Sequence, residues 1–230
     1  MIPGIGSIGG LFKQKTTPFV VSVGTPSLGN AGKATPGQPA GAKVGDVYIL
    51  WQKATNNDGA PIPTPPSSFT KLINTSVVNT VSYMSLSWKI VTVDDEPIPT
   101  DFVDQGNSNH ACFVLVRGCS TSPVDNTTST VDNSVDTTAT CNAFTTTEDK
   151  QLILFFFSGT QSGVFPLVSC SGYTNSSLAD ITELTDTAVE YTQLSIVSAT
   201  KEVAGSVSAT TGTWNKSAIE GNLSIALKGL

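Results

Sequence analysis

The sequence predicts an all-β protein: an antiparallel β-sandwich of the jelly-roll or Greek-key kind, with two pseudo-repeated halves and an extended N-terminal arm. Two observations predict this class. Short apolar runs rich in β-branched and aromatic residues alternate with stretches of Thr, Ser, Gly, Asn and Pro, and no segment shows a clean period of 3.6 residues. Charged residues make up only 13% of the 230 residues, which is typical of short strands joined by polar turns.

Two apolar runs are the strongest strand candidates. Residues 45–52 read Gly-Asp-Val-Tyr-Ile-Leu-Trp-Gln, and residues 149–158 read Asp-Lys-Gln-Leu-Ile-Leu-Phe-Phe-Phe-Ser. Each opens on a polar turn and continues with apolar side chains at successive positions, which is typical of a strand buried on both faces. We expect each run to be the central strand of one half of the sandwich.

The remaining elements of the first half follow in chain order. A short strand at 19–23 precedes a Gly-, Pro- and Ala-rich loop at 24–44, and the Pro-rich turn 61–66 leads to a strand at 69–73. Residues 83–93 alternate in polarity and predict a half-buried antiparallel strand, and 111–118 is an apolar strand closed by glycine. From 120 to 147 the chain is mostly Thr, Ser, Asn and Asp, so we expect an exposed excursion with one edge strand near 135–144.

The second half repeats the order of the first. The pairs Tyr48/Leu152 and Phe69/Tyr173 are offset by 104 residues, Leu86/Leu194 by 108 and Gly118/Gly229 by 111. So small a drift across four strands predicts two repeats, at about 44–118 and 149–230. Because four strands with one wet face bury too little area alone, we expect the repeats to share one core in a single sandwich domain, 19–230.

Residues 1–18 form the predicted N-terminal docking arm. Glycines at positions 4, 6, 9 and 10 prevent a stable helix, so the apolar side chains of this segment cannot bury themselves. We expect the segment either to be disordered or to lie in a groove of a neighbouring subunit. Its candidate docking residues are Ile2, Ile5, Ile8, Leu11 and Phe12.

Composition excludes several partners. A net charge of −6 and a pI near 4.6, with a single close basic pair at Lys13 and Lys15, predict no nucleic-acid partner. No apolar run reaches 18 residues, which predicts no membrane insertion, and the N-terminus lacks the pattern of a secretory signal.

The sequence offers no catalytic signature. The one histidine, His110, has no Gly-x-Ser-x-Gly partner motif, and one His with scattered Cys cannot supply a zinc ligand set. The acidic turn at 94–101 has the character of a solvated surface. We therefore predict a protein that is not an enzyme and has no cofactor or metal.

Three polar or aromatic features leave alternatives open. Trp214 either stacks on a sugar ring or caps the core. The oxygen-rich loop is either a calcium site or merely hydrated; its candidate ligands are Asp125, Asn126, Asp132, Asn133 and Asp136. Among the cysteines, Cys112 is expected to be reduced and buried, Cys119 and Cys141 could bridge the loop, and Cys170 has no assigned partner.

Four motifs carry a family resemblance: Gly-Asp-Val-Tyr-Ile-Leu at 45–50, Pro-Pro-Ser-Ser-Phe-Thr-Lys-Leu at 65–72, Ser-Leu-Ser-Trp-Lys with its Asp-Asp-Glu-Pro turn at 85–97, and Ala-Cys-Phe-Val-Leu-Val-Arg-Gly at 111–118. Together they resemble β-sandwich proteins from the structural gene clusters of tailed bacteriophages. The resemblance covers about 44–118, and Ser68 stands where that pattern usually has glycine.

The resemblance implies a virion protein that docks onto capsid, tail or baseplate through its arm. Its first form is an appendage, a homo-oligomeric fibre or spike, with a trimer expected, that touches a host surface glycan. The alternative is a decoration or cement protein that reinforces the shell, and a third reading is a secreted carbohydrate-binding module. Deleting Met1 to Lys15 should leave a folded sandwich that no longer joins the particle.

Overall fold

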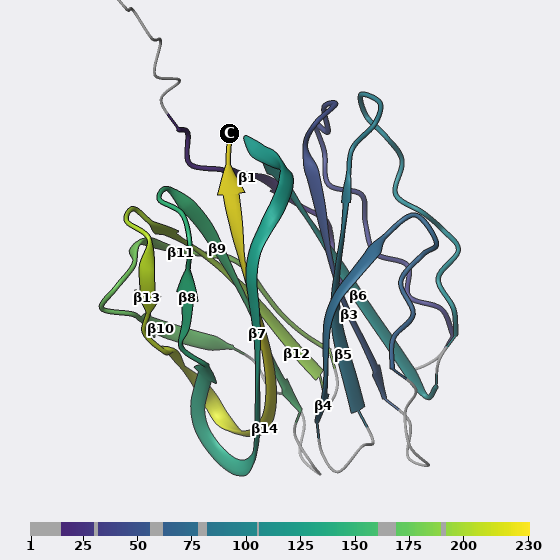
Figure 1. Cartoon of the computed structure of the whole chain (residues 1–230). Coiled ribbons are helices and arrows are strands. Elements are labelled where there is room, and N and C mark those ends of the chain that lie inside the picture. Colours follow the sequence, from purple (N-terminus) through teal and green to yellow (C-terminus); the bar gives the residue numbers. More distant parts are fainter. Residues whose placement is uncertain are drawn as a thin grey trace, which may run out of the picture.

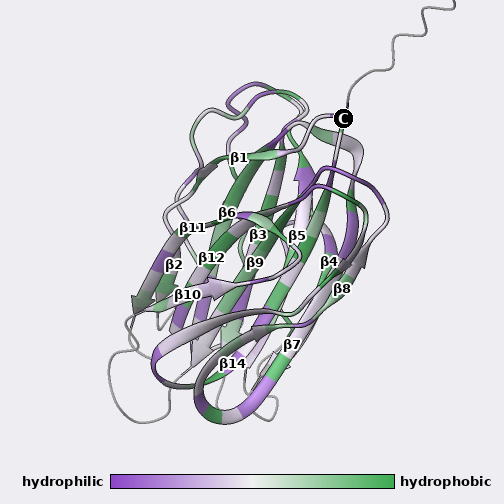
Figure 2. Ribbon diagram, turned by 90° about the vertical axis from the view of Figure 1, so that its left-hand side faces the viewer, coloured by the Kyte–Doolittle hydropathy of each residue, from purple (hydrophilic) through white to green (hydrophobic). Residues whose placement is uncertain are grey.

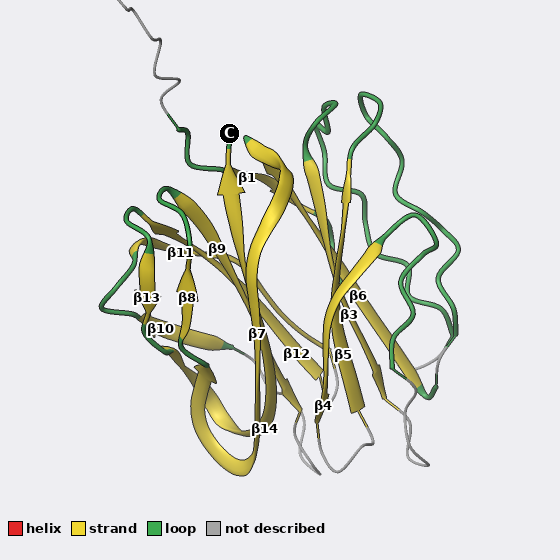
Figure 3. Ribbon diagram, viewed as in Figure 1, coloured by secondary structure: helices red, strands yellow, loops and turns green. Residues whose placement is uncertain are grey.

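The computed structural model shows two antiparallel sheets packed face to face, and no helix occurs in the described part of the chain (Figures 1 and 3). The structure describes residues 15–29, 32–55, 62–77, 82–104, 106–160, 169–189 and 192–230. The predicted all-β antiparallel sandwich is therefore confirmed.

The first sheet is formed by the first half of the chain. Its strand order is β1-β6-β3-β5-β4, and β2 also pairs with β6. Its strands are β1 (Phe19–Val23), β2 (Ser27–Gly29), β3 (Val47–Thr55), β4 (Thr70–Val77), β5 (Ser82–Ile90) and β6 (Ser108–Arg117).

The second sheet is formed by the second half. Its order is β10-β14-β9-β12-β11, and β7 also pairs with β14; a separate two-stranded sheet joins β8 to β13. These strands are β7 (Cys119–Cys141), β8 (Phe144–Thr146), β9 (Gln151–Thr160), β10 (Cys170–Thr174), β11 (Ala179–Val189), β12 (Thr192–Lys201), β13 (Gly205–Val207) and β14 (Thr210–Gly229).

Three apolar clusters explain why the central strands are buried on both faces. The main core lies between the sheets and includes Trp51 and Phe156. The outer face of the first sheet is covered by chain segments that contribute Ala34 and Phe102, and the outer face of the second is covered by residues that include Trp214. Hydrophobic residues accordingly concentrate on the strands (Figure 2). All but the last residue of β3 and of β9 are buried, as the unbroken apolar runs predict.

The two sheets repeat one strand order. In the first sheet β6, β3, β5 and β4 are neighbours in that sequence, and in the second β14, β9, β12 and β11 are. In both, the last strand of the half returns to lie beside the first, a feature shared with Greek keys. The aromatic residues of the repeat also correspond, because Phe69 packs on Phe113 and Tyr173 on Phe157, each on the outer face of its own sheet.

The predicted offset of the central strands is wrong by one residue. Val47 faces the shared core as Leu152 does, whereas Tyr48 faces outward, so the matching offset is 105 rather than 104. A slip of one residue reverses every side chain of a strand. Backbone conformation supports the corrected alignment, because Gly45 and Lys150, also 105 apart, both have positive φ (89° and 54°) just before their strands.

The Thr-rich excursion is also corrected. The edge strand predicted near 135–144 is part of a much longer one, because β7 covers all of 119–141 and pairs along β14. Polar β-branched threonines suit a strand with one solvated face, and pairing with β14 satisfies the backbone. The segment 178–189, which shows no helical period, contains strand β11.

The two ends of the sandwich differ. Lys15–Pro18 and Leu230 lie at one end, here called the terminal end, where the first described residues meet the C-terminus (Figure 1). The opposite end, here called the loop end, carries the strand ends Thr55, Ser82, Ser108, Thr160 and Thr192, which pair with one another within each sheet. The arm residues Ile2, Ile5, Ile8, Leu11 and Phe12 lie outside the described residues.

Candidate docking site at the terminal end

The chain enters the fold fastened to its own C-terminal strand. The Thr16 amide donates to the Leu230 carbonyl at 3.2 Å, and the Leu230 amide donates to the Gly118 carbonyl at 3.0 Å. Gly229 is required here, since a Cβ at that position would lie 1.7 Å from the Thr16 carbonyl oxygen. Lys15 forms an ion pair with Glu148, which shortly precedes β9, a neighbour of β14 in the second sheet. The root of the predicted arm is therefore fixed in place.

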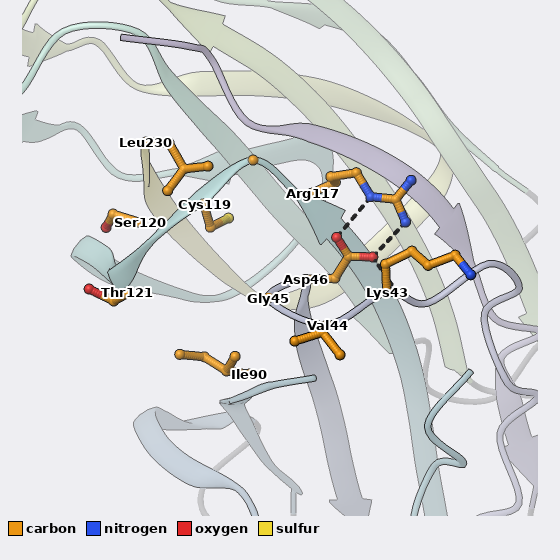
Figure 4. A pocket seen from close by; sticks show the side chains of 11 residues that line it. Lys43, Val44, Gly45, Asp46, Ile90, Arg117, Cys119, Ser120, Thr121 and Leu230 are labelled. Atoms are coloured by element: carbon orange, nitrogen blue, oxygen red, sulfur yellow. Dashed lines mark hydrogen bonds and ion pairs between the residues drawn. The ribbon is translucent and has the colours of Figure 1, made fainter. Parts of the chain in front are cut away.

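A pocket of about 410 Å³ lies beside this root (Figure 4). The loop that precedes β3, the end of β5, the junction of β6 with β7, and the C-terminal residue form its walls. Its lining residues are Lys43, Val44, Gly45, Asp46, Ile90, Arg117, Gly118, Cys119, Ser120, Thr121 and Leu230. Concave, largely apolar surfaces with a few fixed polar groups are typical of binding sites.

The polar wall of the pocket is the Asp46–Arg117 pair. The Arg117 guanidinium donates to both carboxylate oxygens of Asp46, from Nε at 2.9 Å and from Nη2 at 2.7 Å, and the Lys43 amide adds a third bond at 2.8 Å. The Asp46 side chain is 3% exposed. Such a two-pronged charged pair fixes geometry as well as energy, so the loop before β3 and the end of β6 are held rigidly.

These two residues belong to the motifs that carry the family resemblance. Asp46 follows Gly45 in the first motif and Arg117 precedes Gly118 in the last, and the fold brings them together across strands β3 and β6. The acidic turn of the third motif is fastened in the same region, because the Glu96 carbonyl accepts a bond from the Tyr48 hydroxyl at 2.9 Å. The sequence analysis did not pair Asp46 with Arg117. The available signal was that opposite charges flank the two apolar runs, Asp46 before the first and Arg117 after the last.

Apolar side chains gather at the terminal end. Five large apolar side chains at this end are more than half exposed. They lie at the start of β1, on the loop before β3, on the turns after β5 and β12, and at the C-terminus. They are Phe19, Val44, Val93, Val203 and Leu230. Val44 and Leu230 also line the pocket. Val44 and Leu230 therefore extend the apolar lining of the pocket onto the exposed surface around it.

The structure places Trp214 in the core. The side chain is 1% exposed and its indole Nε1 donates to the Glu220 carboxylate at 3.1 Å. Burial raises the pKa of that carboxyl group. Of the two alternatives for Trp214, the core position is the one observed, and the ring offers no surface for stacking on a sugar.

The candidate calcium ligands do not converge. Asp132 accepts the Ser134 amide and Asp136 the Thr138 amide, both at 2.7 Å, and Asp125 binds Thr147 and Gln151. Within the described ranges, no three His, Cys, Asp or Glu side chains lie together as a metal site requires.

The four thiols are free and buried. Cys112 is reduced and buried, as predicted. Cys119 and Cys141 lie at opposite ends of β7, so the bridge considered between them does not form. Burial raises the pKa of the Cys112, Cys119 and Cys170 thiols to about 12, which keeps them protonated and unreactive.

Comparison with known proteins gave no match, whether to protein-family models, to curated proteins or to solved structures. The described residues include no helix that could span a lipid bilayer. What supports a function is therefore the geometry of the terminal end and the resemblance of the 44–118 motifs.

Proposed function

We propose that this chain is a non-enzymatic structural protein of a bacteriophage virion, an appendage of the fibre or spike type that its N-terminal arm anchors to capsid, tail or baseplate proteins. One observation carries the proposal: the root of the arm, the apolar pocket and five exposed apolar side chains share the terminal end. A subunit attached there presents its loop end outward, where a host surface could be contacted.

The apolar arm and the apolar terminal end support the same interface. Residues 2–12 carry the five large apolar side chains of the predicted arm and no charged side chain. When such a segment docks on a partner, burial of its side chains stabilises the complex by about 1.5–3 kcal/mol for each, less the entropy lost on ordering. The partner in this proposal is another virion protein, and neighbouring copies assemble as a homo-oligomer.

The test is incorporation into particles. A variant that lacks residues 1–14 keeps the Lys15–Leu230 seam and should remain folded, with an unchanged circular dichroism spectrum, yet be absent from purified particles. The double variant Val44→Asp/Leu230→Asp should also lose incorporation, because it charges the pocket. Val135→Asp, a matched change at an exposed valine on the β7–β14 ribbon, should be incorporated normally.

Two results would reject the proposal: particles that contain the truncated chain at wild-type copy number, or particles that contain none of the wild-type chain. Electron microscopy of labelled particles separates an appendage from a decoration protein by position. Glycan-array binding separates a host-binding appendage from a cement protein, which should bind no glycan. The carbohydrate-binding module loses the residue that favoured it, since Trp214 is buried.

A further inference from the structure

A lysine is buried between the two sheets at the loop end. Lys53 lies near the end of β3 and is only 1% exposed. Its side chain extends from the first sheet to the second. The Lys53 Nζ atom donates to Thr160 Oγ1 at 2.6 Å and to Ser158 Oγ at 3.3 Å, both on β9. Lys53 thus links the two sheets through two hydroxyl groups of β9.

The groups that surround Lys53 supply no negative charge among the described residues. Its strand neighbours are Met84 on β5 and His110 on β6, and the strands facing it across the core present hydroxyl and apolar groups. Those groups are Ser158 and Thr160 on β9, Thr192 and Leu194 on β12, and Ile219 on β14, whereas Leu28 on β2 pairs with His110 within the first sheet. The one other titratable group facing Lys53 in the described ranges is His110, which is itself a base and is 3% exposed.

Burial of two adjacent bases opposes their protonation. Desolvation lowers the pKa of Lys53 to about 7, and desolvation together with the nearby Lys53 lowers the pKa of His110 to about 3. Both groups are most stable uncharged in the closed sandwich. If the sheets part at this end, water reaches both groups and each regains its ordinary affinity for protons.

We propose that Lys53 and His110 form a proton-sensitive joint that loosens the contact between the two sheets at the loop end as the solution becomes more acidic. The location makes the opening local, because Thr55 and Thr160 end their strands there, while the terminal end is held by the Asp46–Arg117 pair and the Thr16–Leu230 seam. This inference does not depend on the proposed function.

The sign of the effect follows from linkage. In the closed state Lys53 binds its proton only below about pH 7, whereas in the open state it binds it below about pH 10.5. The free energy of opening therefore falls as the pH is lowered from 10.5 to 7, and Lys53 lowers it no further below pH 7. For His110 the corresponding window runs from about 6.5 down to 3. Within each window the opening equilibrium constant rises about tenfold per pH unit.

Hydrogen exchange measured by mass spectrometry on the full chain tests the joint. After correction for the intrinsic exchange rate, peptides covering 50–55 and 156–160 should show an opening constant that rises about tenfold from pH 9 to pH 8, and again by about tenfold from pH 6 to pH 5. Lys53→Met should abolish the first rise and His110→Phe the second. Peptides from 111–117 and 223–229, nearer the terminal end, should show neither.

Three further variants keep the result interpretable. Thr160→Val removes the shorter cross-sheet bond and should raise opening at every pH with the same slope, which tests the joint if Lys53→Met fails to fold. Lys71→Met, on β4, should change nothing at 50–55 or 156–160. Asp58 follows β3 and Glu190 follows β11 in the sequence. Because desolvation rather than an acid lowers the pKa of Lys53, the double variant Asp58→Asn/Glu190→Gln should leave both slopes intact.

Three outcomes would overturn the proposal. They are an opening constant independent of pH in the wild type, an equal rise in the 111–117 and 223–229 peptides, and a slope that disappears in the Asp58→Asn/Glu190→Gln variant. The second would show global unfolding in place of a local joint, and the third would show that an acid, rather than desolvation, governs Lys53.

Discussion

At the scale of single residues, the charged groups of the motifs that carry the resemblance hold loops in place and form no catalytic set. Asp46 receives three N–H bonds, two from Arg117 and one from the Lys43 backbone, and so closes the loop before β3 against the end of β6. The same contacts form one wall of the pocket (Figure 4). A motif that reads as a scaffold in the sequence therefore also shapes the candidate docking surface.

Replacement of this carboxylate measures its contribution. Asp46→Ala should lower the free energy of unfolding by about 2 kcal/mol, because charge-assisted bonds to a buried carboxylate are lost while the guanidinium stays partly covered. Urea denaturation followed by fluorescence gives the value. Asp94→Asn is the control: that carboxylate also contacts Lys43, but its side chain is 58% exposed, so the midpoint should barely move. Equal losses in the two variants would contradict the role given to Asp46.

At the scale of elements, backbone packing fixes where the arm leaves the fold. Gly229, the last residue of β14, lies directly beneath the Thr16 carbonyl, and Gly118 lies beside Pro18. Gly212, on the same strand, lies beneath side chains instead: a Cβ there would be 2.9 Å from Cys170 Sγ and from the Tyr173 ring. Substitution of Gly229 should therefore disturb the arm root, and substitution of Gly212 should disturb β10, each without the other.

Gly229→Ala should detach residues 15–18 from the C-terminal strand, because a backbone carbonyl at 1.7 Å cannot be relieved by rotating a side chain. We expect faster hydrogen exchange at 16–20 and a loss of about 1 kcal/mol in the free energy of unfolding. Gly212→Ala should leave exchange at 16–20 unchanged and accelerate it at 170–174. Unchanged exchange at 16–20 in Gly229→Ala would show that the seam does not hold the arm root.

Elements with an apolar signal were predictable from the sequence, and those that depend on pairing were not. The runs that became β3 and β9 are buried on both faces, so continuous apolar residues identified them. β7 has no such run, because its residues are mostly Thr, Ser, Asn and Asp, and β14 provides the hydrogen bonds that make it a strand. The face of Tyr48 was missed for a related reason: a continuous apolar run contains no alternation from which to fix the register.

Of the candidate site, sequence reasoning supplied an apolar arm and the motifs, but not the place where they meet. Asp46 and Arg117 are 71 residues apart, and only the pairing of β3 with β6 brings them together. The burial of Lys53 was equally hidden, because a lysine that interrupts an apolar strand usually points to solvent. Here the opposite sheet supplies hydroxyl partners for it.

At the scale of the whole molecule, the two ends of the sandwich differ in structure. The terminal end has fixed backbone, exposed apolar side chains and the pocket, whereas the loop end has strand ends and the buried Lys53–His110 pair. In a particle-bound subunit the terminal end would be covered and the loop end exposed. Additions at the two ends should therefore have opposite effects on assembly.

A folded domain fused to Leu230 should block incorporation into particles, because it would stand beside the arm root and over the pocket that Leu230 lines. The same domain inserted between residues 164 and 165 should be incorporated near wild-type level, since the flanking strand β9 ends at the loop end. Both fusions should unfold at the wild-type temperature, which excludes a folding defect as the cause. If the fusion at Leu230 assembled and the insertion did not, the molecule would be attached by its loop end, and the orientation proposed for the subunit would have to be reversed.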